Sequence, residues 1–228
     1  MSYIKKIIKS LKEIIITYLL QYIIIFLACL IYKLLGYNNL NHFINTYCPI
    51  IMIIFYTLTS IYLYQKNKTN QTKLPIKNYY PLILLGISIS CLLNMIIFLL
   101  NKPTPTTSSI NMLVLTLSSG IIGPIYEEIL FRQINLNRLK KFNTEKKSII
   151  LNSLLFALIH ISSIKIFYAF ILGLIINIAY TKTNNIKSPI IIHMSANLIA
   201  LLLTQYNSYI LFLSLIGLFI SYDLLKNQ

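Results

Sequence analysis

Residues 120–132 read Gly-Ile-Ile-Gly-Pro-Ile-Tyr-Glu-Glu-Ile-Leu-Phe-Arg, and they close a hydrophobic segment that begins near Met112. The chain has five acidic residues, and two of them, Glu127 and Glu128, stand side by side in this apolar stretch. A charged carboxylate at the centre of a transmembrane helix costs about 2.5–3.5 kcal/mol on insertion scales. Two adjacent carboxylates predict a functional site, and we interpret the rest of the chain as a membrane scaffold built around it.

The composition points to a membrane protein. Of the 228 residues, 57% are hydrophobic and 11% are charged, and the mean hydropathy is +0.72. Soluble domains are usually about 45–50% apolar and about 25% charged. We therefore predict a multi-pass protein of the cell membrane, with the lipid bilayer as its surroundings. Cys29, Cys48 and Cys91 are an odd, scattered set in or near apolar segments, which gives no disulfide framework and no zinc spacing.

The hydropathy pattern predicts an all-α, polytopic membrane helix bundle with about eight transmembrane helices. The predicted spans cover residues 14–35, 43–64, 81–100, 111–131, 148–163, 166–180, 188–204 and 208–225. Some of the last four are short for a straight crossing of about 20 residues, which is compatible with partial submersion of one or two. We treat residues 1–228 as a single membrane domain, with N-terminal helices in 1–110, a catalytic core in 111–204 and a final helix in 205–228.

The net charge of +15 does not imply a nucleic acid partner, because the basic residues gather between hydrophobic segments. With eight spans and both termini cytoplasmic, the inner side holds 17 of the 20 lysines and arginines, including those of loops 65–80 and 138–147. The outer side holds Lys33, Lys102 and Lys165. The positive-inside rule therefore favours this topology. Residues 1–12 place isoleucines on one helical face, which predicts an amphipathic helix at the membrane surface.

Helical spacing predicts different surroundings for the two carboxylates. Glu128 and Arg132 are four residues apart, with the acid first, which is the favourable order for an ion pair on one face. Glu127 lies about 100° round the helix and is left to face a cavity. Gly123-Pro124, directly before the pair, is expected to kink the helix and open space.

The same spacing of four residues occurs in two later spans, between Phe156 and His160 and between His193 and Asn197. At a rise of about 1.5 Å per residue, Glu127 and both histidines reach compatible depths. We expect them to converge on one cavity that opens to the cytoplasm. A membrane histidine also often serves only to hydrogen-bond a neighbouring helix, and this alternative stays open. We expect this interhelical role for the single asparagines Asn94 and Asn177.

Three motifs in the core resemble those of the CAAX protease and bacteriocin-processing family, also called the Abi family, whose members are similar to the type 2 CAAX prenyl endopeptidase. Each motif falls on its own predicted helix, and the three occur in the family's order. The first, Glu-Glu-x-x-x-Arg, matches Glu127, Glu128 and Arg132; the second, Phe-x-x-x-His, matches Phe156 and His160; the third, His-x-x-x-Asn, matches His193 and Asn197.

The resemblance implies an intramembrane endopeptidase, of the metalloendopeptidase class by family, that cuts a membrane-associated peptide or protein of CAAX-like or bacteriocin type. Glu127 would activate a water as general base. His160 and His193 would either ligate a metal or bind the water and polarise the carbonyl, and Asn197 would stabilise the oxyanion. Glu127 and the two histidines are also a plausible zinc set, although we slightly favour a metal-free mechanism.

The remaining motif residues, Glu128, Arg132 and Phe156, would contact the catalytic residues and hold them in position. Two other functions are compatible with the same sequence. One is a non-enzymatic bacteriocin self-immunity or scaffold protein that keeps the fold and sequesters a partner. The other is a small proton-coupled transporter, in which Glu127 and the histidines relay protons.

Overall fold

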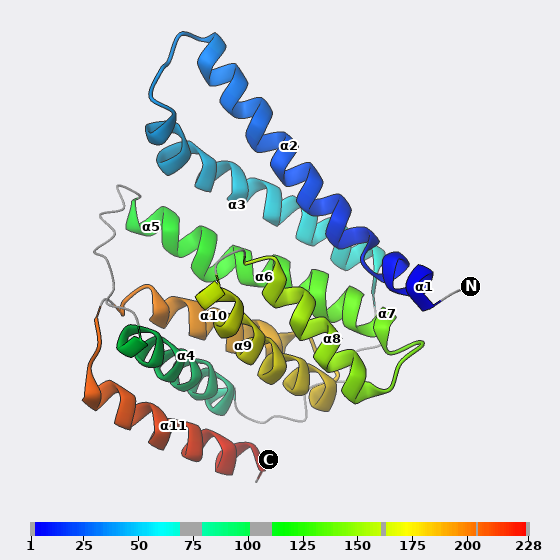
Figure 1. The fold of residues 1–228 in the computed structure, drawn as a ribbon, viewed down its shortest axis with the longest axis vertical. Coiled ribbons are helices and arrows are strands. Elements are labelled where there is room, and N and C mark those ends of the chain that lie inside the picture. Colours follow the sequence, from blue (N-terminus) through cyan, green and yellow to red (C-terminus); the bar gives the residue numbers. More distant parts are fainter. Residues whose placement is uncertain (1–2, 69–78, 101–110, 161–162, 204, 227–228) are drawn as a thin grey trace.

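The computed structural model describes residues 3–68, 79–100, 111–160, 163–203 and 205–226, and in these ranges all regular structure is helical (Figure 1). This confirms the predicted all-α class. The helices are α1 (Tyr3–Ser10), α2 (Lys12–Leu34), α3 (Leu40–Lys66), α4 (Tyr80–Leu100), α5 (Met112–Leu115), η1 (Thr116–Ile122), α6 (Gly123–Glu128), η2 (Ile129–Leu136), α7 (Asn137–Leu139), α8 (Glu145–Leu158), α9 (Ser163–Thr183), α10 (Lys187–Ala200) and α11 (Ser208–Lys226). Most of loop 65–80 and the whole of the predicted 101–110 connection, Lys102 included, lie outside the described residues.

Within the described residues, six helical segments are long and apolar enough to cross a membrane, so the chain is a multi-pass membrane protein. The fifth and seventh predicted spans are instead the shorter helices α8 and α10, of 14 residues each. At about 1.5 Å per residue each measures about 21 Å, which is less than the hydrocarbon thickness of about 30 Å. Six of the about eight predicted spans are therefore long enough to cross, and these two are short, as we allowed for one or two of the last four.

The fourth predicted span is longer than expected and runs as one helix from Met112 to Lys140, through α5, η1, α6, η2 and α7. We had ended it at Phe131, because polar residues follow. Those polar residues are buried and bonded inside the protein: Gln133 Nε2 donates to the Asn67 carbonyl at 2.8 Å, and Asn135 has no exposed surface. The helix thus continues because its polar side chains find partners on other helices.

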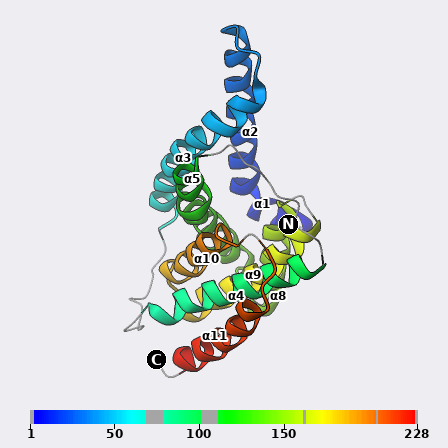
Figure 2. The same ribbon diagram turned by 90° about the vertical axis from the view of Figure 1, so that its left-hand side faces the viewer.

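α10 occupies the middle of the bundle, where it packs against α4, α9, α6 and η1. α11 lies on the far side of α4, and the α2–α3 hairpin covers the opposite side of the molecule (Figures 1 and 2). The approach of α4 to α10 is close because Gly86 has no side chain. A Cβ there would lie 2.4 Å from the Ile192 carbonyl oxygen, so any larger residue would push α10 and its His193 away.

A chain of buried amides joins three helices. Asn135 Nδ2 donates to Asn152 Oδ1 at 2.7 Å, Asn152 Nδ2 donates to Asn177 Oδ1 at 2.8 Å, and Asn177 Nδ2 donates to Ser153 Oγ at 2.8 Å. None of these four side chains has exposed surface. The interhelical role expected for Asn177 is confirmed, and the chain fixes α8 against both η2 and α9.

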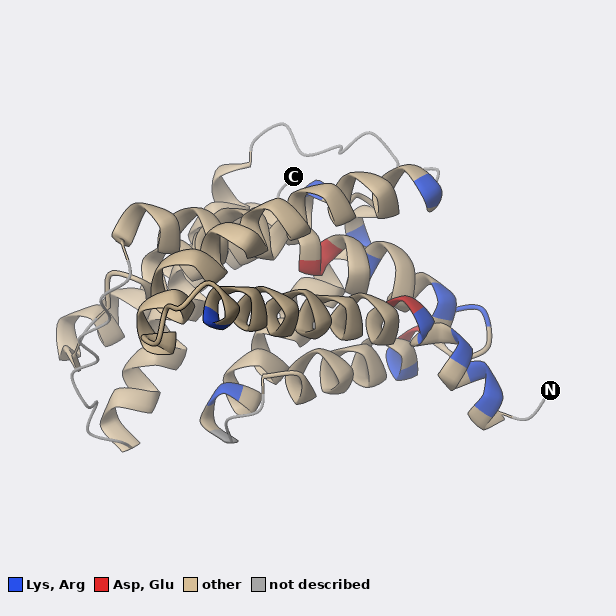
Figure 3. Cartoon of the chain, turned by 90° about the horizontal axis from the view of Figure 1, so that it is seen from above, with Lys and Arg blue, Asp and Glu red and all other residues tan. Residues whose placement is uncertain are grey.

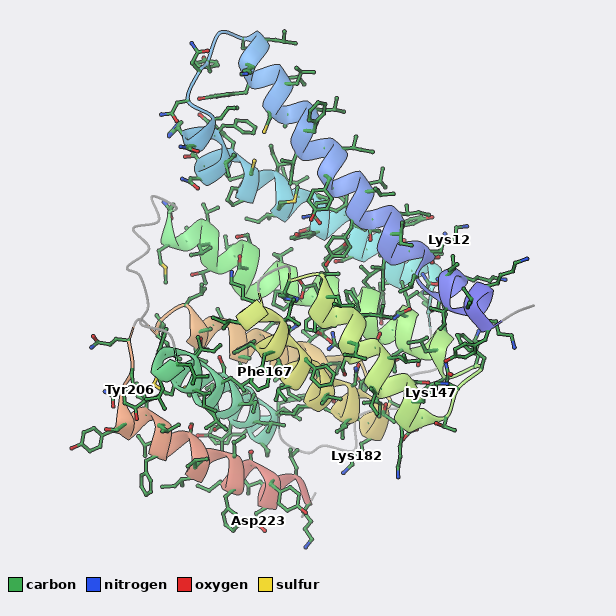
Figure 4. The ribbon with its side chains drawn as sticks, in the orientation of Figure 1. Lys12, Lys147, Phe167, Lys182, Tyr206 and Asp223 are labelled. Atoms are coloured by element: carbon green, nitrogen blue, oxygen red, sulfur yellow. The ribbon has the colours of Figure 1, made fainter. Side chains whose placement is uncertain are left out.

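The described lysines and arginines gather at one end of the bundle, which we call the basic end (Figure 3). It holds α1, the end of α3, the α7–α8 connection and the α9–α10 connection. Lys12, Lys147 and Lys182 lie at this end and Tyr206 at the other (Figure 4). Lys33 and Lys165 lie at the ends of α2 and α9 opposite to it. Arg132, which is one of the 17 basic residues that we assigned to the inner side, is buried in the interior of the protein.

Asn152→Leu tests the amide chain. The substitution leaves Asn135 Nδ2 and Asn177 Oδ1 buried without their partner, and each such group costs about 1–3 kcal/mol. We expect a clearly lower melting temperature of the purified protein in detergent micelles. The control Asn41→Leu changes an exposed asparagine and should melt like the wild type. Equal melting of the two variants would show that the amide chain does not hold α8.

Candidate active site

Glu128 is a carboxylate with no exposed surface, held by a cation on its own helix. Its Oε1 lies 3.0 Å from Arg132 Nη1, and the Arg132 side chain is fully buried as well. The ion pair that the spacing predicts is therefore present. Within the described residues, Arg132 Nε and Nη2 and Glu128 Oε2 have no hydrogen-bond partner, so the pair depends on its single close contact.

His193 on α10 connects the two carboxylates. Its Nδ1 lies 2.6 Å from Glu128 Oε1, and its Nε2 lies 3.8 Å from Glu127 Oε2. Because a carboxylate accepts, we place the ring proton on Nδ1, where it is donated to Glu128, and Nε2 of the neutral ring then carries the lone pair. Glu127 makes no direct hydrogen bond at 3.8 Å, and its side chain keeps 23% of its surface exposed.

Phe156 on α8 packs against three of the other groups of the cluster, Arg132, His160 and His193. The Arg132 guanidinium carbon lies 4.4 Å from its ring centroid, and its ring meets those of His160 and His193 edge to face at 5.0 and 5.7 Å. His160 Nδ1 lies 2.9 Å from the Phe156 carbonyl oxygen. Because a carbonyl only accepts, Nδ1 of His160 donates there, which leaves Nε2 for a ligand.

Asn197 lies one turn after His193 and contacts the fourth predicted span. Its Nδ2 donates to the Ser119 carbonyl oxygen at 2.9 Å. An amide nitrogen carries two hydrogens, so one donor remains beyond this contact. The contact also joins α10 to η1, next to the wider π-helical backbone there, where the Gly123 N–H donates to the Ser118 carbonyl. Such π-helical turns occur frequently at functional sites.

Four of the predicted residues line one cavity of about 640 Å³: Glu127, His160, His193 and Asn197. Glu128 and Arg132 lie behind its wall, and Phe156 forms part of the wall. The sequence missed other lining residues, namely Tyr56, Asn94, Ser118, Ser119, Lys165 and Tyr168. Of these, Asn94 carried a signal as a polar residue within a span, but we had interpreted it as a contact between helices.

The cavity lies in the half of the bundle away from the basic end. It is lined by the second halves of α4, α8 and α10, by the first half of α9 and by the Met112–Lys140 helix up to Glu127. Glu127 stands near the middle of that helix, because the helix continues to Lys140 and does not end at Phe131. The lining residues do not fix the side on which the cavity opens, so its opening to the cytoplasm stays a prediction.

The three residues suggested for zinc do not form a metal site in this geometry. Among the described residues, no three His, Cys, Asp or Glu side chains lie close enough to hold one ion. In particular, His193 Nδ1 is engaged by Glu128 and His160 Nδ1 by a carbonyl oxygen. We therefore derive no chemical step through a metal.

Two comparisons relate this chain to known proteins. Residues 109–199 match the sequence model of the family described as Type II CAAX prenyl endopeptidase Rce1-like. Over these residues the chain is similar to this family of endopeptidases. It is also 29% identical over 171 residues to the membrane-embedded CAAX protease MroQ of Staphylococcus aureus (strain USA300), an alignment that covers 65% of this chain and 68% of that protein. No solved structure gives a significant match.

Arg132→Met tests whether the two carboxylates have separate roles. It leaves Glu128 buried without its cation, and breaking a buried pair in this way costs about 3–5 kcal/mol. We expect a strong loss of yield and of thermal stability in detergent. Glu127→Gln changes a partly exposed group and should preserve both.

The double variant Glu128→Leu/Arg132→Met is the matched control, because removing both charges together leaves neither one unpaired. It should recover much of the stability that Arg132→Met loses. If Glu127→Gln were as unstable as Arg132→Met, the proposed division between the two carboxylates would be wrong.

Proposed function

We propose that this protein is an intramembrane endopeptidase that uses Glu127 to activate a water. One observation carries the proposal: of the two adjacent carboxylates, Glu128 is buried and engaged, whereas Glu127 lines the cavity 3.8 Å from His193 Nε2. A polar separation beyond 3.5 Å leaves room for a bridging water. The similarity of residues 109–199 to the Rce1-like endopeptidase family, and of the chain to a membrane-embedded CAAX protease, supports the same reaction.

In the proposed mechanism the bridging water donates one hydrogen to Glu127 Oε2 and the other to His193 Nε2. Its lone pair is then directed into the cavity, toward the carbonyl carbon of a bound peptide. Glu127 takes the proton as the water attacks, and it delivers this proton to the amine when the peptide bond breaks. Glu128 holds the His193 ring in the tautomer whose Nε2 accepts.

The tetrahedral intermediate carries a negative oxygen that needs donors. The remaining N–H of Asn197 is one, since its other N–H binds the Ser119 carbonyl. His160 supplies a second when Nε2 is protonated, because its Nδ1 is fixed on the Phe156 carbonyl. Asn197 and His160 would thus stabilise the negative oxygen of the intermediate.

We further propose that both termini and the basic end face the cytoplasm, as the positive-inside rule favours. The cavity then lies in the outer half of the membrane. The substrate class that fits is a membrane-associated peptide or protein segment whose scissile bond lies in that half. Prenylated and bacteriocin-type substrates both remain compatible with this class.

Glu127→Gln tests the proposed base. Removing a general base usually costs about 10²–10⁴-fold in rate. We expect at least a hundredfold loss of peptide cleavage by purified protein in proteoliposomes, with normal yield. The control Glu145→Gln changes an exposed glutamate that pairs with Lys140 at the surface, and it should keep full activity.

Full cleavage by the Glu127→Gln variant would contradict the protease mechanism. Absence of cleavage by the wild type, together with solute flux into the proteoliposomes, would favour the transporter. The same assay therefore separates these two functions.

Cysteine labelling tests the proposed orientation. In a chain with Cys29, Cys48 and Cys91 replaced by serine, we expect an impermeant thiol reagent to label Tyr206→Cys from outside intact cells. Asn143→Cys, in the α7–α8 connection at the basic end, should be labelled only after the cells are opened. The reverse pattern would place the basic end outside.

A further inference from the structure

A second cavity, of about 480 Å³, lies at the basic end and shares no residue with the candidate active site. It is lined by Lys6, Lys9, Ser10, Lys12, Glu13, Lys66, Arg138, Lys141 and Phe142. These residues come from α1, the start of α2, the end of α3 and the segment that includes and follows α7. Cations that are far apart in sequence are thus brought around one space.

The charge of this cavity is not balanced by the protein. Six of its lining side chains are cationic and one, Glu13, is anionic. Glu13 is already engaged, because both of its oxygens contact the Arg138 guanidinium, with Nη2 donating to Oε1 at 2.7 Å. Among the described residues, none of the five lysines forms a close ion pair with Glu13, although the charge of Lys66 acts on it and Lys66 Nζ donates to the Tyr62 hydroxyl at 3.1 Å. Such an arrangement attracts an anion.

The position of the cavity indicates where this anion comes from. α2 begins at Lys12 and α3 ends at Lys66, and both of these helix ends belong to the basic end, where Figure 3 shows the basic residues gathered and Figure 4 labels Lys12. The cavity therefore lies at one end of two helices that are long and apolar enough to cross a membrane. Ile4 and Ile8 of α1 are 68% and 57% exposed. An amphipathic helix with exposed isoleucines lies in the membrane surface, with its apolar side toward the acyl chains.

We propose that this cavity binds the phosphate of an anionic phospholipid headgroup. The lysines supply positive charges to the phosphate oxygens, and Arg138, held by its contact with Glu13, lines the site beside them. The acyl chains of the lipid would run beside the exposed apolar faces of α1 and α2. A phosphate ester is the chemistry recognised, and a soluble phosphate could supply the same group, so the test includes both sources.

The experiment measures lipid binding by native mass spectrometry of the full chain released from neutral detergent. Phosphatidylglycerol is titrated against phosphatidylcholine, which has the same acyl chains and no net charge. We expect the wild type to retain phosphatidylglycerol at least tenfold more tightly. In Lys9→Gln/Lys66→Gln/Lys141→Gln this preference should fall about tenfold. These lysines are exposed, so the helical circular dichroism should not change.

The matched control is Lys140→Gln/Lys146→Gln/Lys187→Gln, which removes the same charge from the same end but outside the cavity. It should stay within twofold of the wild type. Equal losses in the two triple variants would overturn the proposal, because the binding would then follow diffuse charge. Displacement of the lipid by millimolar inorganic phosphate would overturn the lipid as the natural ligand and identify a soluble anion instead.

Discussion

The structure depends on one buried ion pair, between Glu128 and Arg132, together with the imidazole that completes it. A carboxylate and a guanidinium with no exposed surface are stable inside a membrane protein only when each neutralises the other. Because they are four residues apart on one helix, the pairing requires little beyond helical geometry. The 2.6 Å contact to His193 then ties this helix to α10. The pair therefore determines both the position and the proton arrangement of a histidine that lines the cavity.

The orientation of the adjacent carboxylate, Glu127, follows from the same ion pair. Glu127 stands about 100° round the helix from Glu128, so the face that buries the ion pair directs Glu127 toward the cavity. The remaining groups are fixed from other helices. Phe156 covers the Arg132 guanidinium and supplies the carbonyl that orients His160, and the amide chain through Asn152 holds α8 in place. Both histidines are thus oriented by a polar contact of their Nδ1 atoms, His193 by Glu128 and His160 by the Phe156 carbonyl.

Much of this arrangement could be predicted from local spacing. The helical class, the Glu128–Arg132 pair and the presence of four polar residues on one cavity follow from the period of the helix. The contacts that local spacing cannot predict are those between helices, such as His193 with Glu128 and Asn197 with Ser119. The helix beyond Phe131 was missed for a related reason, since Gln133 and Asn135 look like loop residues until their partners on α3 and α8 are known. That extension in turn placed the cavity in the other half of the bundle.

The central claim is that Glu128 fixes the His193 tautomer while Glu127 stays available for chemistry. Nitrogen-15 NMR of the imidazole, assigned by comparison with His193→Gln, tests it most directly. The account predicts that His193 carries its proton on Nδ1, that Glu128→Gln changes this signal strongly and that Glu127→Gln changes it little. A proton on Nε2 in the wild type, or equal responses to the two substitutions, would contradict it.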